Sequence, residues 1–197
     1  MEPLKIVKYP HPVLTFDSKP IRRINQHLRD TIQEMFALMY EFEGVGLAAN
    51  QVAIPYQFLV MNPTGDPEQK ESEYAFINPV IRRKRGKATE NEGCLSFPDL
   101  RIEIQRADEI DFQAVTLDGE LRDYTWKGFA ARIVQHETDH LHGHCFYERA
   151  GVGLKIEQLD ILNSLETIYE SDRKLGFASP ENGFGDLIEV WEKEQDA

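Results

Sequence analysis

The sequence predicts an α+β fold in which mostly antiparallel sheets pack around a central helix, with a long N-terminal helix and a helical C-terminal extension. Three observations lead to this prediction. A helical apolar pattern near the N-terminus is followed by a block of short β-rich segments, and a second helical pattern follows that block. Short turn signals between the β-rich segments favour antiparallel pairing, because parallel strands need long crossover connections.

The first helix is predicted over residues 21 to about 43. Its apolar side chains recur at spacings of three and four residues, which places one stripe on one face: Leu28, Ile32, Met35, Phe36, Met39 and Tyr40. Gly44 is expected to end this helix, because glycine commonly follows the last helical residue. Before the helix, Pro10 and Pro12 each disfavour helical structure in the preceding residue.

The middle of the chain is rich in β-branched and aromatic residues, and we expect strands at residues 58–61, 74–82, 101–105, 109–117 and 121–126. Turn signals separate or interrupt these segments. The pair Asp118-Gly119 predicts a hairpin between the last two strands.

A second helix is predicted from about Gly128 to Gly143. Beyond it, an amphipathic helix is supported by Ile156, Leu159, Leu162, Leu165 and Ile168, and a last short helix by residues 187–194. The tail from residue 151 onward holds four Lys/Arg and eleven Asp/Glu residues, so it is acidic. We interpret it as a solvated helical element packed on the core, with a protein-interaction element as the alternative.

Charge and composition limit the classes of protein to which this chain can belong. The formal net charge of −12 argues against a protein that coats nucleic acid, and specific nucleic-acid binding is not expected. The basic run at residues 82–87 is interpreted as a solvated strand end or hairpin, with a weak RNA contact as the alternative. No stretch approaches 18 apolar residues and no signal or transit peptide pattern opens the chain, so we expect a cytoplasmic protein without membrane contact.

Residues 135–140 carry the pattern His-Glu-x-x-His, formed by His136, Glu137 and His140. Helical residues four apart differ by about 40° around the axis and lie one turn apart, so two imidazoles can bind one ion. An ion lowers the pKa of a bound water, and the adjacent carboxylate can accept its proton. Apolar residues flank the motif, and buried polar groups of this kind are costly without a shared partner. A polar surface helix is the alternative.

The third ligand must come from elsewhere. The longer metzincin peptidase pattern needs a histidine at position 146, where the chain has Phe146. His142 and His144 are expected off the metal-facing side or at the helix end. Cys94 is a candidate, because a thiolate beside two imidazoles suits zinc or ferrous iron and leaves a fourth position for water. The alternative for Cys94 is a small buried thiol in a strand.

Residues 44–51 form a third segment of interest, containing Gly44, Val45, Gly46 and Gln51. Its two glycines and two alanines leave room for a group pressed against the chain, and Gln51 offers an amide donor. Read alone, the segment indicates a helix stop and a tight turn.

Together, the three segments closely resemble the peptide deformylase family. Residues 44–51 match Gly-x-Gly-Leu-Ala-Ala-x-Gln, residues 92–96 match Glu-Gly-Cys-Leu-Ser, and residues 136–143 match the family's His-Glu-x-x-His helix with its following Leu-x-Gly, in the family's order. The resemblance covers about residues 4–150. We therefore expect a catalytic domain at residues 1–150 and an acidic, partly helical extension at residues 151–197.

The resemblance implies a metal-dependent hydrolase. Cys94, His136 and His140 would hold one divalent ion, which the family commonly uses as Fe²⁺, with Zn²⁺, Ni²⁺ or Co²⁺ as substitutes. Glu137 would act first as general base and then as general acid. One carboxylate can carry the proton between the two steps of amide hydrolysis. The residues present do not choose between iron and zinc.

The resemblance also implies the substrate and the groups that bind it. The side-chain amide of Gln51 and the backbone N–H of Leu95 would stabilise the oxyanion. The N-formylmethionyl end of a new polypeptide would bind extended along the strand that includes Gly46, beside Gly44 and Val45. The products would be formate and a free amino terminus. The further partner we expect is the ribosome, through a weak and transient contact.

Two sets of supporting residues are expected around this site. Glu92, Arg106 and Asp139 are candidates for an ion network behind the histidines, because ligand imidazoles usually have their second nitrogen held. Ordinary surface charge is the alternative for these three. Ile133 is the first choice for the methionine pocket. Two other functions are weighed: a zinc peptidase that uses the helix motif alone, and a non-catalytic binding protein on the same fold.

Overall fold

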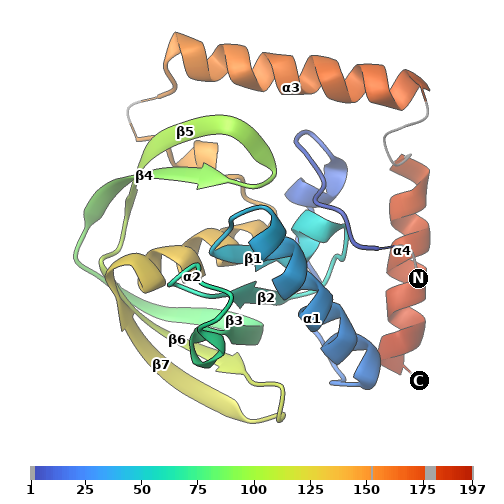
Figure 1. Cartoon of the computed structure of the whole chain (residues 1–197), viewed down its shortest axis with the longest axis vertical. Helices are drawn as coiled ribbons and strands as arrows, with labels where there is room; N and C mark the ends of the chain where they lie inside the picture. The colour runs from blue at the N-terminus through green and yellow to red at the C-terminus, as the bar shows by residue number, and fades with distance from the viewer. Residues whose placement is uncertain (1–2, 152, 176–180, 197) are drawn as a thin grey trace.

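The computed structural model describes residues 3–151, 153–175 and 181–196 (Figure 1). The α-helices are α1 (Gln26–Glu41), α2 (Gly128–Leu141), α3 (Ile156–Leu175) and α4 (Glu181–Asp196). Short 3₁₀ helices are η1 (Pro12–Thr15), η2 (Ala49–Val52), η3 (Lys70–Ser72) and η4 (Phe146–Arg149). The strands are β1 (Gly46–Ala48), β2 (Phe58–Met61), β3 (Tyr74–Arg85), β4 (Ala88–Cys94), β5 (Phe97–Arg106), β6 (Glu109–Val115) and β7 (Leu121–Lys127).

The strands form two antiparallel sheets, and the fold is of the predicted α+β class. The larger sheet has five strands in the order β1-β2-β3-β6-β7, and the smaller one is the β4-β5 hairpin. Strand β1 therefore lies at an edge of the large sheet. Figure 1 shows α2 between the two sheets, so this helix is enclosed on several sides.

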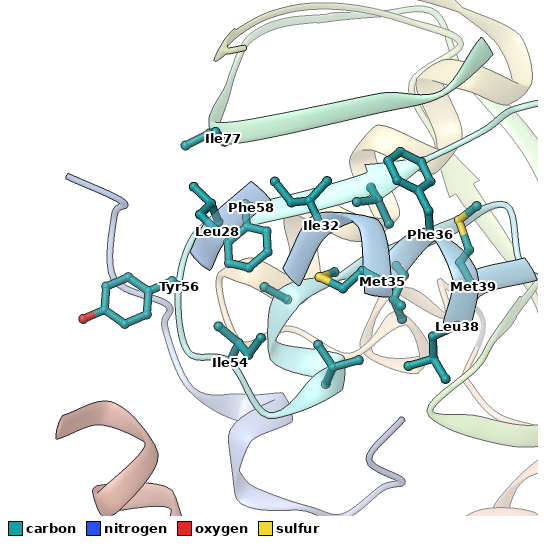
Figure 2. Close-up of a cluster of buried hydrophobic side chains, with 14 of the residues drawn as sticks. Leu28, Ile32, Met35, Phe36, Leu38, Met39, Ile54, Tyr56, Phe58 and Ile77 are labelled. Atoms are coloured by element: carbon teal, nitrogen blue, oxygen red, sulfur yellow. The ribbon is translucent and has the colours of Figure 1, made fainter. Parts of the chain in front are cut away.

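Strand β2 is buried on both faces, because α1 and α2 cover opposite sides of the large sheet. Successive side chains of a strand point to opposite faces. Phe58 and Val60 accordingly join the apolar cluster of α1, whereas Leu59 and Met61 join the cluster of α2. Figure 2 shows the α1 side, where the predicted helical stripe packs around Phe58.

The C-terminal helices pack against the rest of the molecule at two places. Leu162 of α3 is buried in a cluster with β5 and η4. Trp191 of α4 is buried in the α1 cluster, where its ring contacts those of Tyr56 and Phe58. These contacts agree with helices packed on the core. No helix in the described ranges is long and apolar enough to cross a membrane.

Several element boundaries differ from the sequence prediction. Helix α1 begins at Gln26 instead of residue 21, because the Asn25 side chain accepts the N–H of Leu28 and caps the helix there. Strand β4 was not predicted, and β5 is longer than predicted. Helix α4 begins at Glu181 instead of residue 187.

Other predicted features agree with the structure. A turn at Asp118-Gly119 joins β6 to β7, although β6 already ends at Val115. The basic run at residues 82–87 continues β3 to Arg85 and enters the turn to β4, as a solvated strand end. Helix α2 ends at Leu141, two residues before Gly143.

Candidate metal centre and active site

Three potential metal ligands meet between α2 and the end of β4. His136 and His140 lie one helical turn apart, with ring centroids separated by 4.9 Å. Cys94, the last residue of β4, brings its Sγ to 3.1 Å from Nε2 of His140. Donor atoms of the three residues all lie within 4.8 Å of one another. One thiolate and two imidazoles at this spacing fit a divalent transition ion with an open fourth position.

The other histidines near this helix do not join the group. His142 and His144 are exposed, and their Nδ1 atoms lie near Asp17 and Glu148, respectively. Phe146, at the position where a metzincin would need histidine, packs its ring against that of His136 at 5.7 Å. The third donor of this cluster is therefore a thiol from the small sheet.

Glu137 lies beside the ligands and faces a cleft of about 460 Å³. Burial raises the pKa of its carboxyl to about 7, against the opposing effect of nearby His136. Its Oε2 has no hydrogen-bond partner among the described residues. A carboxyl group with such a pKa can both accept and donate a proton near neutral pH.

Gly46 explains how β1 can lie so close to this carboxyl group. A Cβ atom built on Gly46 would lie 2.5 Å from Glu137 Oε1 and 2.8 Å from Cγ2 of Ile133. Both distances are far below van der Waals contact, so any side chain at this position would force the Glu137 carboxyl group and the Ile133 side chain to move. The predicted substrate residues Gly44, Val45, Gly46 and Ile133 all line the cleft.

Gln51 directs its amide toward the ligands from η2. Its Oε1 accepts the N–H of Ala48 at 2.9 Å, which leaves Nε2 to face the thiol group. That Nε2 lies 3.4 Å from Cys94 Sγ and 3.2 Å from Ser96 Oγ. Leu95 follows Cys94 in the turn between β4 and β5 and also lines the cleft. The two predicted oxyanion donors are thus brought to the same end of the cleft.

The three residues expected behind the histidines form one hydrogen-bonded network. Glu92 Oε2 lies 3.0 Å from His136 Nδ1. Arg106 donates to both Glu92 oxygens, at 2.7 and 3.0 Å, and to Asp139 Oδ2 at 2.7 Å. Burial alone would raise the pKa of Glu92, but hydrogen bonds from His136 and Arg106 outweigh it and hold this pKa at about 2. Glu92 is therefore an ionised acceptor that orients the His136 ring.

Three further residues at this site were not predicted from the sequence. Arg132, one turn before His136, is buried and donates to Glu92 Oε1 and to the carbonyl of Ile104. The sequence feature that could have indicated Arg132 is a single charged residue on an otherwise apolar face of the predicted helix. Ser96 was part of a matched motif, and its hydroxyl contacts the Gln51 amide. Lys8 lies just before Pro10 in the N-terminal segment, and its side chain contacts the carbonyl of Leu95.

Comparisons with known proteins match most of the chain to a single family. The family model described as polypeptide deformylase matches residues 3–153. A peptide deformylase of Rhodopirellula baltica is 40% identical over 190 residues, covering 96% of this chain and 94% of that protein. The chloroplastic peptide deformylase 1B of Oryza sativa is 36% identical over 181 residues, covering 91% of this chain and 66% of that protein.

Solved structures give the same result. A peptide deformylase from Plasmodium falciparum has a TM-score of 0.82 at 34% identity and covers 85% of this chain and 98% of that chain. A peptide deformylase from Thermotoga maritima has a TM-score of 0.71 at 36% identity and covers 77% of this chain and 99% of that chain. The chain therefore belongs to the polypeptide deformylase family.

Proposed function

We propose that the chain removes the formyl group from the N-formylmethionyl end of new polypeptides with Glu137 as its proton carrier. The observation that carries this assignment is the buried Glu137 oxygen that has no partner among the described residues and lies in a cleft beside the Cys/His/His group. A pKa of about 7 suits a group that takes a proton from water and returns it to the leaving nitrogen.

Cys94, His136 and His140 would hold the ion, which we propose is Fe²⁺ in the cell, with Zn²⁺, Ni²⁺ or Co²⁺ as substitutes. When bound, a divalent ion polarises the formyl oxygen and lowers the pKa of water. The donor set supports such an ion, because a thiolate and two neutral imidazoles leave a position for substrate. A ferrous site with a thiolate ligand should be sensitive to oxygen.

The substrate would bind as an added strand on the free edge of β1. An extended peptide can pair with an exposed sheet edge through main-chain hydrogen bonds. Gly46 on that edge leaves no side chain between the peptide and Glu137, and Ile133 supplies an apolar wall for the methionine side chain. The amide of Gln51 and the N–H of Leu95 would stabilise the developing oxyanion.

Residues 1–150 would supply this catalysis and residues 151–197 would form an extension to it. We propose a cytoplasmic enzyme whose partners are formylated nascent peptides, with at most a weak and transient contact with the ribosome. The exposed basic residues Arg82, Arg83 and Lys84 at the end of β3 are the surface that supports such a contact.

The test of this function is formate release from a formyl-Met tripeptide by protein purified without oxygen and loaded with Fe²⁺. We expect rapid release that is abolished in Glu137→Ala while the metal stays bound. A Glu137→Ala protein without metal would mean that Glu137 is structural. A wild-type protein that binds one metal through Cys94 but releases no formate would indicate a changed substrate or a binding protein.

The oxyanion role of Gln51 has its own test. Loss of one oxyanion donor typically costs about 100- to 1000-fold in rate, so Gln51→Ala should lose activity by roughly that factor and retain its metal. Gln105→Ala on the exposed face of β5 is the matched control. Full activity in Gln51→Ala would remove this amide from the mechanism.

A further inference from the structure

The N-terminal segment lies against both elements that carry the proposed oxyanion donors. The N–H of Val7 donates to the carbonyl of Gln51 at 2.8 Å. The N–H of Tyr9 donates to the carbonyl of Ser96 at 3.0 Å. Between them, Nζ of Lys8 donates to the carbonyl of Leu95 at 2.6 Å. Three consecutive residues thus bridge η2, which carries one donor, and the β4–β5 turn, which carries the other.

We propose that Lys8 is a positioning residue that holds the Leu95 backbone in the orientation needed for oxyanion stabilisation. This inference rests on the proposed function. The Leu95 carbonyl belongs to the same residue as the N–H donor, so fixing the carbonyl limits rotation of the backbone on one side of that donor. Cys94 limits it on the other side when its thiolate is a metal ligand.

A lysine is suited to this position by charge and by reach. Hydrogen bonds from an ammonium group are shorter and about twice as strong as neutral ones. Lys8 is half-buried and lines the cleft, and its Nζ lies 5.4 Å from the centroid of the Phe42 ring. A neutral apolar side chain would leave the Leu95 carbonyl without this donor in a turn that must keep one geometry.

The segment that carries Lys8 is itself anchored from the C-terminal extension. The Tyr9 ring stacks on Phe97 at 5.0 Å, and its hydroxyl donates to Glu166 Oε1 of α3 at 2.7 Å. Phe97 in turn packs against Phe146, which contacts His136. Lys8 therefore acts from a backbone that is fixed on both sides, so its side chain can impose an orientation on Leu95.

The experiment compares Lys8→Met, Lys8→Arg and Lys5→Met in the full chain. Because misplacement by about 1 Å can cost about 100-fold, we expect Lys8→Met to lower kcat by roughly 10- to 100-fold with KM changed less than about twofold. Lys8→Arg keeps a charged donor and should recover most of kcat. Lys5→Met removes an exposed lysine of the same segment and should match the wild type.

Two further measurements separate positioning from structural damage. The Co²⁺-loaded Lys8→Met protein should keep the wild-type visible absorption spectrum and metal content, since all three ligands remain. If Lys8→Met unfolds too readily for assay, Lys8→Leu, which also removes the side-chain donor, replaces it with the same expected loss of kcat.

Three outcomes would overturn the inference. The first is an unchanged kcat in Lys8→Met, and the second is an equal loss in Lys8→Met and Lys8→Arg. The third is a lost or altered cobalt spectrum, which would place the effect on the metal ligands. A wild-type protein that releases no formate would overturn the proposed function together with this inference, so the two failures are distinguishable.

Discussion

Two arginine–carboxylate clusters in this molecule have the same bonding geometry and different surroundings. In the interior cluster, Arg106 donates to both oxygens of Glu92, and both side chains are only 5% exposed. On the outer face of the large sheet, Arg85 donates to both oxygens of Asp111 at 2.6 Å, with side-chain exposures of 37% and 31%. The geometry alone would not tell the two clusters apart.

Burial decides what each cluster does. Removing one member of a buried ion pair leaves an uncompensated charge, whereas exposed pairs are screened by water and salt. The interior cluster also contacts a potential metal ligand through Glu92, whereas the outer cluster contacts only strand residues. We therefore expect the interior cluster to govern both stability and metal affinity and the outer cluster to govern neither.

Glu92→Ala should have the largest effect. It removes the acceptor of His136, Arg106 and Arg132 together, so we expect a loss of about 3–5 kcal/mol in the free energy of unfolding. Metal affinity should fall by about 10- to 100-fold, the usual cost of losing the group that holds a ligand imidazole. Urea unfolding and competition with a metal chelator measure the two effects.

The neighbouring Glu90→Ala variant is the matched control for Glu92→Ala. Glu90 lies on the same strand and pairs with the same Arg132 at 3.2 Å, but its side chain is 52% exposed. It removes the same charge and should leave metal affinity unchanged. Equal effects of the two substitutions would show that burial does not distinguish them.

Arg106→Met should have an intermediate effect. Glu92 keeps Arg132, and Asp139 keeps Arg149, so each carboxylate retains one cationic partner. We expect a loss at or below the lower end of the range for buried pairs, about 2–3 kcal/mol, with a measurable fall in metal affinity. A variant with wild-type metal affinity and formate release would remove Arg106 from the support of His136.

Arg85→Met should have the smallest effect. The pair is exposed, so the thermal midpoint, metal content and rate should stay close to those of the wild type. Any small difference in midpoint should shrink in higher salt, because salt screens exposed charges. A drop in formate release comparable to that of Arg106→Met would contradict the separation of the two clusters.

The sequence predicted much of the fold through local periodicity. The apolar stripe of α1 and the hairpin at Asp118-Gly119 follow from spacing and turn chemistry. Strand β4 was missed because residues 88–94 contain a single β-branched residue, Thr89, and no aromatic residue, and its hydrogen bonds come from pairing with β5. The beginning of α1 was predicted too early because Asn25 caps the helix, while Gln195 of α4 holds the preceding backbone by accepting the N–H groups of Arg22 and Arg23.

By itself, the sequence determined that His136 and His140 lie on one side of a helix, because helical spacing is set by the backbone. Only the tertiary structure decided that Cys94 reaches His140 across 46 positions and that Lys8 reaches Leu95 across 87. These contacts depend on how the small sheet and the N-terminal segment pack around α2, and no periodicity along the chain encodes that packing.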